Sequence, residues 1–145
     1  MGKLIKLNFR SVIIIFILID ILCAGAGMGV PVFCILLGFP LGWYIEKRIS
    51  ASVEQSYQKY HKIFKYSLSA AVFTFILMVI TWGTAVLINI DSSSDIENFG
   101  HPYILFNPVA SFIGWLILMV IISPFLQLLT TIFSAFLALM RSETE

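Results

Sequence analysis

The sequence is poor in charge. Only 12% of its 145 residues are charged and 59% are hydrophobic, whereas soluble domains are about 25% charged. A domain of this size exposes too much surface to hide that apolar share from water. Nine basic and eight acidic residues leave a net charge of +1, which excludes the basic surface of a nucleic-acid-binding protein. The composition predicts an integral membrane protein whose main partner is the lipid bilayer.

Motifs of enzymes and metal sites are also lacking. The two cysteines, Cys23 and Cys34, are joined by no second cysteine or histidine pair of the kind that binds zinc. No phosphate-binding glycine loop, nucleophile elbow or HExxH motif is present. The acids Asp91, Asp95 and Glu97 do not have calcium-loop spacing. We therefore expect no cofactor, no metal and no enzymatic activity.

A long apolar run extends from Ser11 to Ile45. As one helix it would measure roughly 50 Å, against about 30 Å of hydrocarbon in a bilayer. Three glycines and Pro31 interrupt it within residues 24–31, because glycine disfavours a helix and proline begins one well. We predict two short membrane spans over about 11–27 and 30–46. A re-entrant second segment is the alternative.

The first span could be confused with a secretory signal peptide. Basic residues precede an apolar stretch, and Ala24-Gly25-Ala26 is typical of a cleavage site. However, Asp20 interrupts the stretch and the hydrophobic run continues past the site. We therefore expect an uncleaved first helix.

Basic residues indicate the orientation. They cluster before the first span and after the second, whereas the glycine-rich turn has none. Because basic residues stay on the cytoplasmic side, both flanks are expected inside and the turn outside. The loop over 89–102 has three acids and no lysine or arginine, as expected of the outer side. The predicted location is the cytoplasmic membrane of a prokaryote, with the N-terminus inside.

The second basic flank, residues 46–65, is predicted to be a cytoplasmic amphipathic linker helix. Apolar residues recur there at steps of three and four, and no glycine or proline occurs between Gly42 and Gly83. Lys59 and Lys62 would face anionic lipid. The helix could rest on its own bundle or be a docking surface for a partner.

The predicted third span covers about 66–88 and the fourth about 104–123, opened by Asn107 as N-cap and Pro108 as first helical residue. Pro124 is expected to kink or end that helix. An apolar helix over 124–140 follows, with polar residues on one face: Gln127, Thr130, Thr131 and Ser134. It could lie at the inner interface, prolong a kinked helix or cross back as a fifth span. Arg141 favours an inside C-terminus. The prediction is an all-α, polytopic protein of four transmembrane helices in one membrane domain.

Asp20 is the one ionisable residue inside a predicted span. A charged carboxylate at midspan is costly, so it should face protein or water. In this chain alone we expect it to be protonated and hydrogen-bonded to a hydroxyl such as Thr74, Thr81 or Thr84. Alternatively it is ionised and serves a proton or cation route.

Two further sets of residues are candidates. Cys23 and Cys34 flank the outer turn symmetrically, so a disulfide or redox pair is geometrically feasible, although buried cysteine is common without any function. Gly25 and Gly29, and Gly38 and Gly42, have the spacing that lets helix backbones approach closely. That contact could be made within the first hairpin or with an oligomer or partner.

Three functions remain open on the sequence alone. The first is a non-enzymatic accessory, assembly or interaction subunit of a membrane complex, because the chain is small and has little mass outside the membrane. The second is a small proton- or cation-coupled transporter, or a channel-like oligomer, that uses Asp20. The third is an envelope thiol-redox protein that uses Cys23 and Cys34.

Overall fold

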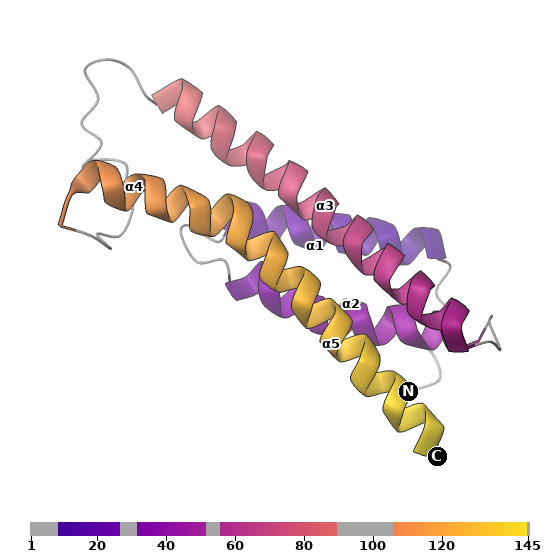
Figure 1. The fold of residues 1–145 in the computed structure, drawn as a ribbon. Helices are drawn as coiled ribbons and strands as arrows, with labels where there is room; N and C mark the ends of the chain where they lie inside the picture. Colours follow the sequence, from indigo (N-terminus) through magenta and orange to yellow (C-terminus); the bar gives the residue numbers. More distant parts are fainter. Residues whose placement is uncertain (1–8, 27–31, 52–55, 90–105, 145) are drawn as a thin grey trace.

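A computed structural model describes residues 9–26, 32–51, 56–89 and 106–144, and these ranges contain helices and no strand. The elements are α1 (Phe9–Ala26), α2 (Val32–Ser50), α3 (Ser56–Asn89), α4 (Pro108–Ile117), the π-helical turn η3 (Leu118–Ile122) and α5 (Ser123–Thr144). Figure 1 shows α4 and α5 as one long rod, with α2 lying against its α5 half. The predicted all-helical fold is confirmed for the described residues.

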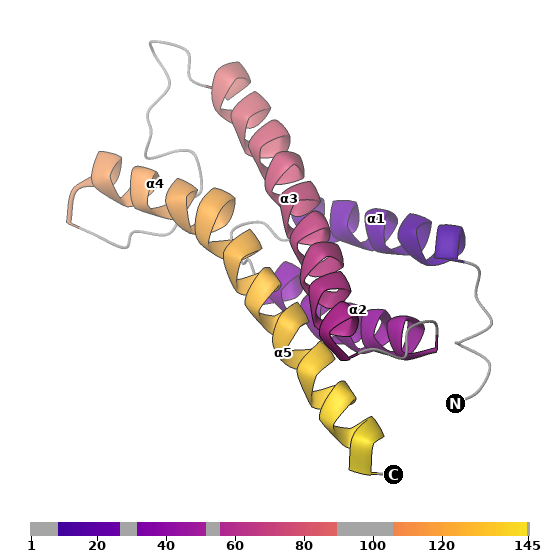
Figure 2. The same ribbon diagram turned by 45° about the vertical axis from the view of Figure 1, so that its right-hand side comes forward.

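Side-chain contacts give the relative directions of the helices. The Tyr60 ring stacks on Phe136 at a centroid distance of 5.6 Å, and Trp82 meets Trp115 edge-on at 4.4 Å. Residue numbers therefore rise along α3 as they fall along the rod, so the two run antiparallel. Figures 1 and 2 both show the start of α3 at the end of the molecule where α5 finishes.

The directions of α1 and α2 follow from their contacts with α3 and α5. Phe16 of α1 contacts Phe73 of α3, and Asp20 contacts Thr74, so α1 and α3 run in the same direction. Helix α2 is parallel to α5, because the residue numbers of both helices increase together along their contact. Successive elements α1, α2, α3 and the α4–α5 rod thus point in alternating directions.

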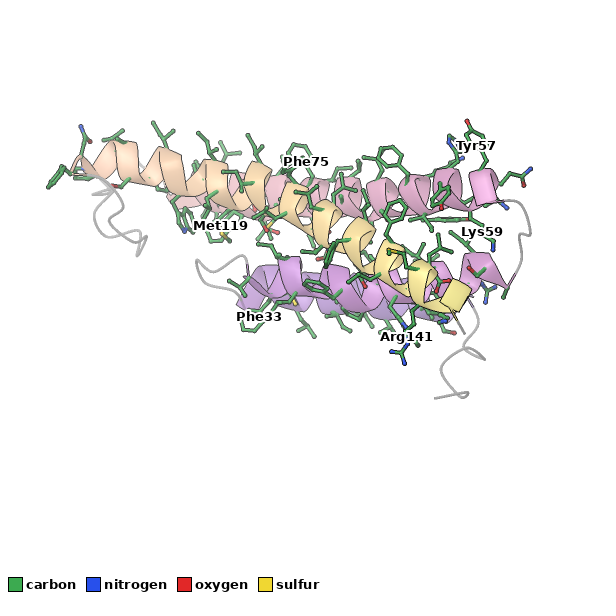
Figure 3. All side chains as sticks on the ribbon, turned by 60° about the horizontal axis from the view of Figure 1, so that its bottom comes forward. Phe33, Tyr57, Lys59, Phe75, Met119 and Arg141 are labelled. Carbon is green, nitrogen blue, oxygen red and sulfur yellow. The ribbon has the colours of Figure 1, made fainter. Side chains whose placement is uncertain are left out.

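Two helices are long and apolar enough to cross a membrane, over Tyr57–Ile88 and Pro108–Ser142. A shorter apolar helix covers Ser11–Cys23. Large apolar side chains are exposed around the bundle, and in Figure 3 Phe33 of α2 and Phe75 of α3 point away from it. These features support a membrane location.

The segment predicted as a linker helix over 46–65 is divided between two helices. Helix α2 continues to Ser50 and α3 begins at Ser56, while residues 52–55 lie outside the described part. The absence of glycine and proline lets each neighbouring helix extend into the segment. The apolar stripe is divided too: Ile45 and Ile49 are buried, whereas Tyr57 is exposed. The segment therefore belongs to the two long helices.

Of the alternatives for the stretch after Pro124, the structure shows a prolonged helix, so the boundary placed between 104–123 and 124–140 is not a helix end. The Asn107 cap is confirmed, since its Oδ1 accepts from the backbone N–H of Val109 at 2.9 Å. From Pro108 the helix continues to Thr144 through η3, where the Ser123 N–H donates to the Leu118 carbonyl five residues back. The π-helical turn accommodates the ring and the missing N–H of Pro124 without ending the helix. The described chain therefore does not turn back at Pro124.

The closest helix packing is between α2 and α5. A Cβ added at Gly38 would meet Thr130 Oγ1, Gln127 O and Thr131 Oγ1, and one added at Gly42 would meet the Thr131 carbonyl. The glycines thus let the two backbones approach. Two hydroxyls of α5 use this closeness: Thr130 donates to the Ile35 carbonyl at 2.8 Å and Ser134 to the Phe39 carbonyl at 2.7 Å.

Candidate functional site

Asp20 is fully buried between α1 and α3. The Thr74 hydroxyl donates to its Oδ2 at 2.7 Å, which confirms the predicted hydroxyl partner and selects Thr74 among the three candidates. Thr81 and Thr84 instead donate to carbonyls of their own helix. The Cys34 thiol lies against the same carboxyl. Among the described residues, none donates a hydrogen bond to Asp20 Oδ1.

The Thr74 hydroxyl stands between two acceptors. Its Oγ1 lies 2.7 Å from Asp20 Oδ2 and 3.2 Å from the Ala70 carbonyl of the preceding turn. A hydroxyl has one hydrogen and two lone pairs. A protonated Asp20 can therefore donate to Thr74 while Thr74 donates to Ala70, and all three groups are satisfied. The arrangement suits a neutral carboxyl that joins two helices.

The two cysteines belong to one cluster, near the end of α1 and the start of α2. Cys34 is buried against Met78, and Cys23 packs on the same cluster with Trp82. Both are free cysteines, so no disulfide joins them. The predicted thiol pair is thus brought into one neighbourhood, and its redox role stays a prediction.

The glycine predictions separate into two groups. Gly38 and Gly42 form a close contact, but their partner is α5 and not α1 of their own hairpin. The sequence pattern indicates a close approach without indicating which helix approaches. Gly29 and the side-chain surroundings of Gly25 lie outside the described part.

A cavity of about 450 Å³ lies between α1, α2 and α3. Most of its lining is apolar, and the two charged residues of that lining are Arg48 of α2 and Lys62 of α3. Of the two lysines predicted to contact lipid or a partner, Lys62 therefore borders a cavity. Lys59 is partly exposed and is not part of the cavity lining.

Glu46 is a buried acid to which sequence reasoning assigned no role. It is fully buried, and its Oε1 accepts from Ser50 at 2.8 Å and from Ser142 of α5 at 3.4 Å. Lys47 Nζ lies 3.9 Å from Oε2. The sequence signal that could have found it is periodicity. Glu46 follows Gly42 by four residues, as Gly42 follows Gly38, so all three lie on the same face of α2.

Gln127 is a second buried polar residue. It is fully buried on α5, and neither its amide nitrogen nor its amide oxygen has a hydrogen-bond partner within the described ranges. Its backbone carbonyl accepts from the Thr131 hydroxyl at 2.7 Å. The predicted polar face of residues 127–134 therefore points into the bundle, toward α2.

In the described residues, no group of three or more potential metal ligands comes together. The described chemistry includes the carboxyl–hydroxyl contacts of Asp20 and Glu46, the thiol cluster and the cavity with a cationic border. Comparison of the chain with protein families, with curated proteins and with solved structures finds no match.

Proposed function

We propose that this chain is a non-enzymatic, four-span protein of the cytoplasmic membrane that acts as an accessory or assembly subunit of a larger complex. The alternating directions of α1, α2, α3 and the α4–α5 rod support four crossings. Lys47 and Arg48 lie in the last turn of α2 and Arg141 in the last turn of α5. These basic ends support a cytoplasmic location for the α2–α3 connection and for the C-terminus.

One observation carries the proposal of a partner: the long helices continue beyond the first hairpin and remain apolar there. Cys34, near the start of α2, packs at the level of Met78 of α3. From Met78, α3 continues to Asn89, which is about 16 Å at 1.5 Å per residue. We call this end of α3 (residues 83–89), together with α4, the outer arm.

The outer arm has an apolar surface that is not covered within the described chain. Leu87 is 82% exposed, Ile88 79% and Ile113 52%. Helix α1 has 18 residues, about 27 Å, which nearly spans the roughly 30 Å of hydrocarbon. If the hairpin matches the bilayer, the arm extends past the lipid tails and needs another apolar cover. The cover that fits is the surface of a second membrane protein.

The test is to purify the chain from its native membrane in mild detergent and to identify co-purifying proteins by mass spectrometry. We expect a stoichiometric membrane partner, and we expect Ile113→Trp to reduce its recovery about tenfold or more. Overpacking an interface typically costs about 1–3 kcal/mol, and about 1.4 kcal/mol is tenfold in affinity.

Leu137→Trp on α5 is the matched control, because Leu137 is equally exposed at 51% but lies away from the arm. Its partner recovery should equal that of the wild type. A wild-type chain that is always recovered alone and monodisperse would contradict the accessory-subunit proposal.

A second candidate function is favoured by the Asp20 site. Its Oδ1 is buried without a hydrogen-bond donor among the described residues, and a proton or small cation could bind there. In that case, chains reconstituted in vesicles with an internal pH-sensitive dye would conduct protons or cations, and Asp20→Asn would abolish the flux. Flux that Asp20→Asn leaves unchanged would eliminate this candidate.

A further inference from the structure

The cavity between α1, α2 and α3 has the features of a site for one lipid. Its volume of about 450 Å³ falls in the range of about 300–1,000 Å³ that is usual for ligand pockets. The wall is formed by apolar faces of all three helices, including Val12, Phe16, Leu41 and Phe73. Such a wall suits a hydrocarbon chain.

The polar residues of the cavity are concentrated toward one end. Arg48 is in the last turn of α2 and Lys62 is near the start of α3, so both cations lie at the end predicted to be cytoplasmic. Among the described residues that line the cavity, none is acidic. Glu46, the acid of α2, is buried against Ser142 of α5. The two cations thus give this end of the cavity a positive charge that suits a negative group.

The length of the cavity matches one leaflet of a bilayer. Along α3 its lining runs from Lys62 to Phe73, about 16 Å at 1.5 Å per residue. Half of a hydrocarbon core is about 15 Å. An acyl chain that begins at the cationic end would thus end near the midplane, where Phe16 and Phe73 close the wall at a centroid distance of 6.2 Å.

We propose that this cavity binds an anionic phospholipid of the cytoplasmic leaflet, with its phosphate at Arg48 and Lys62 and one acyl chain between α1, α2 and α3. The proposal rests on the proposed membrane topology and not on the proposed partner. A chain that is recovered without a protein partner would therefore leave it standing.

The experiment measures how much lipid the protein retains. The chain is reconstituted in vesicles of phosphatidylcholine and phosphatidylglycerol in equal amounts, extracted in mild detergent and passed through gel filtration. Bound lipid is then quantified by mass spectrometry. We expect about one phosphatidylglycerol per chain and strong discrimination against phosphatidylcholine. Added inorganic phosphate should not displace the lipid, because the acyl chain supplies much of the binding.

Two variants test the two halves of the site. Arg48→Gln with Lys62→Gln should weaken phosphatidylglycerol binding about 30-fold, since each cation near anionic lipid contributes about fivefold. Ser69→Trp, which places a ring in the lining, should exclude the acyl chain and also remove the bound lipid. The matched control is Lys59→Gln with Lys65→Gln. It removes two positive charges from α3 at residues that are not part of the cavity lining, and this variant should retain the lipid.

Several outcomes would overturn the proposal. One is equal retention of the two lipids by the wild-type chain. Another is equal loss in the Arg48/Lys62 and Lys59/Lys65 double variants, which would indicate unspecific attraction to a charged surface. Unchanged retention in Ser69→Trp would likewise show that lipid does not occupy the cavity. Helicity and gel-filtration profile, measured on each variant, identify any loss that comes from unfolding.

Discussion

Gly42→Ala is expected to destabilise the folded protein by about 1–3 kcal/mol, the usual cost of overpacking a close contact. The added Cβ would meet the Thr131 carbonyl and would lie 3.0 Å from the Ala135 nitrogen and from Ser134 Cβ. Two of these atoms are backbone and cannot rotate away, so α2 and α5 must move apart. That movement would also lengthen the hydrogen bond from Ser134 to the Phe39 carbonyl.

The measurement is unfolding of the purified chain in detergent, followed by circular dichroism. Gly83→Ala and Gly114→Ala are the controls, because a Cβ at either position meets nothing within 4 Å. Alanine is about 1 kcal/mol better than glycine inside a helix, so both should be neutral or slightly stabilising. Equal stability of Gly42→Ala and Gly83→Ala would show that α2 and α5 do not approach at Gly42.

Thr74→Val is expected to cost about 1–3 kcal/mol, the penalty for leaving a buried polar group without its partner. Valine keeps the shape of threonine but cannot hydrogen-bond to Asp20. Asp20 Oδ2 would then lose its hydrogen bond from Thr74, inside a fully buried site where Oδ1 already has no donor among the described residues. Thr84→Val should have almost no effect, since the exposed Thr84 hydroxyl bonds only to carbonyls of its own helix.

A double-mutant cycle separates this contact from general packing. Asp20→Leu combined with Thr74→Val removes both polar groups, and such paired replacements are often nearly neutral. The double variant should therefore be more stable than the sum of the single changes indicates, measured by the same unfolding assay. Strict additivity, or an equal cost for Thr74→Val and Thr84→Val, would mean that Asp20 does not depend on Thr74.

The Asp20 contact could be predicted from the sequence because few hydroxyls were available. The predicted third span has only three threonines, and a neutral carboxyl in lipid needs a partner. Asn107 followed by Pro108 was equally informative, since capping depends on local chemistry alone. Features that depend on neighbouring residues or on a small choice of partners could thus be predicted from the sequence.

Features that depend on the rotation and length of helices could not be predicted from the sequence. Gly38 and Gly42 indicate a close approach, but spacing within one helix does not identify the other helix. Pro124 removes a hydrogen bond, yet a π-helical turn before it preserves a continuous rod. Glu46 meets Ser142 at the end of that rod, and this contact could not be inferred while the course of the chain after Pro124 was open.

The parallel contact of α2 and α5 is repetitive, and this makes its alignment ambiguous. The glycines, the two accepting carbonyls and the two donating hydroxyls all recur at steps of four residues. Sliding α5 by one turn, about 5.4 Å, would bring Thr130 or Ser134 to the other carbonyl and would keep one of the two hydrogen bonds. The bond from Ser142 to Glu46 has no such second position. The contact between Ser142 and the buried Glu46 therefore favours one of these similar alignments over the others.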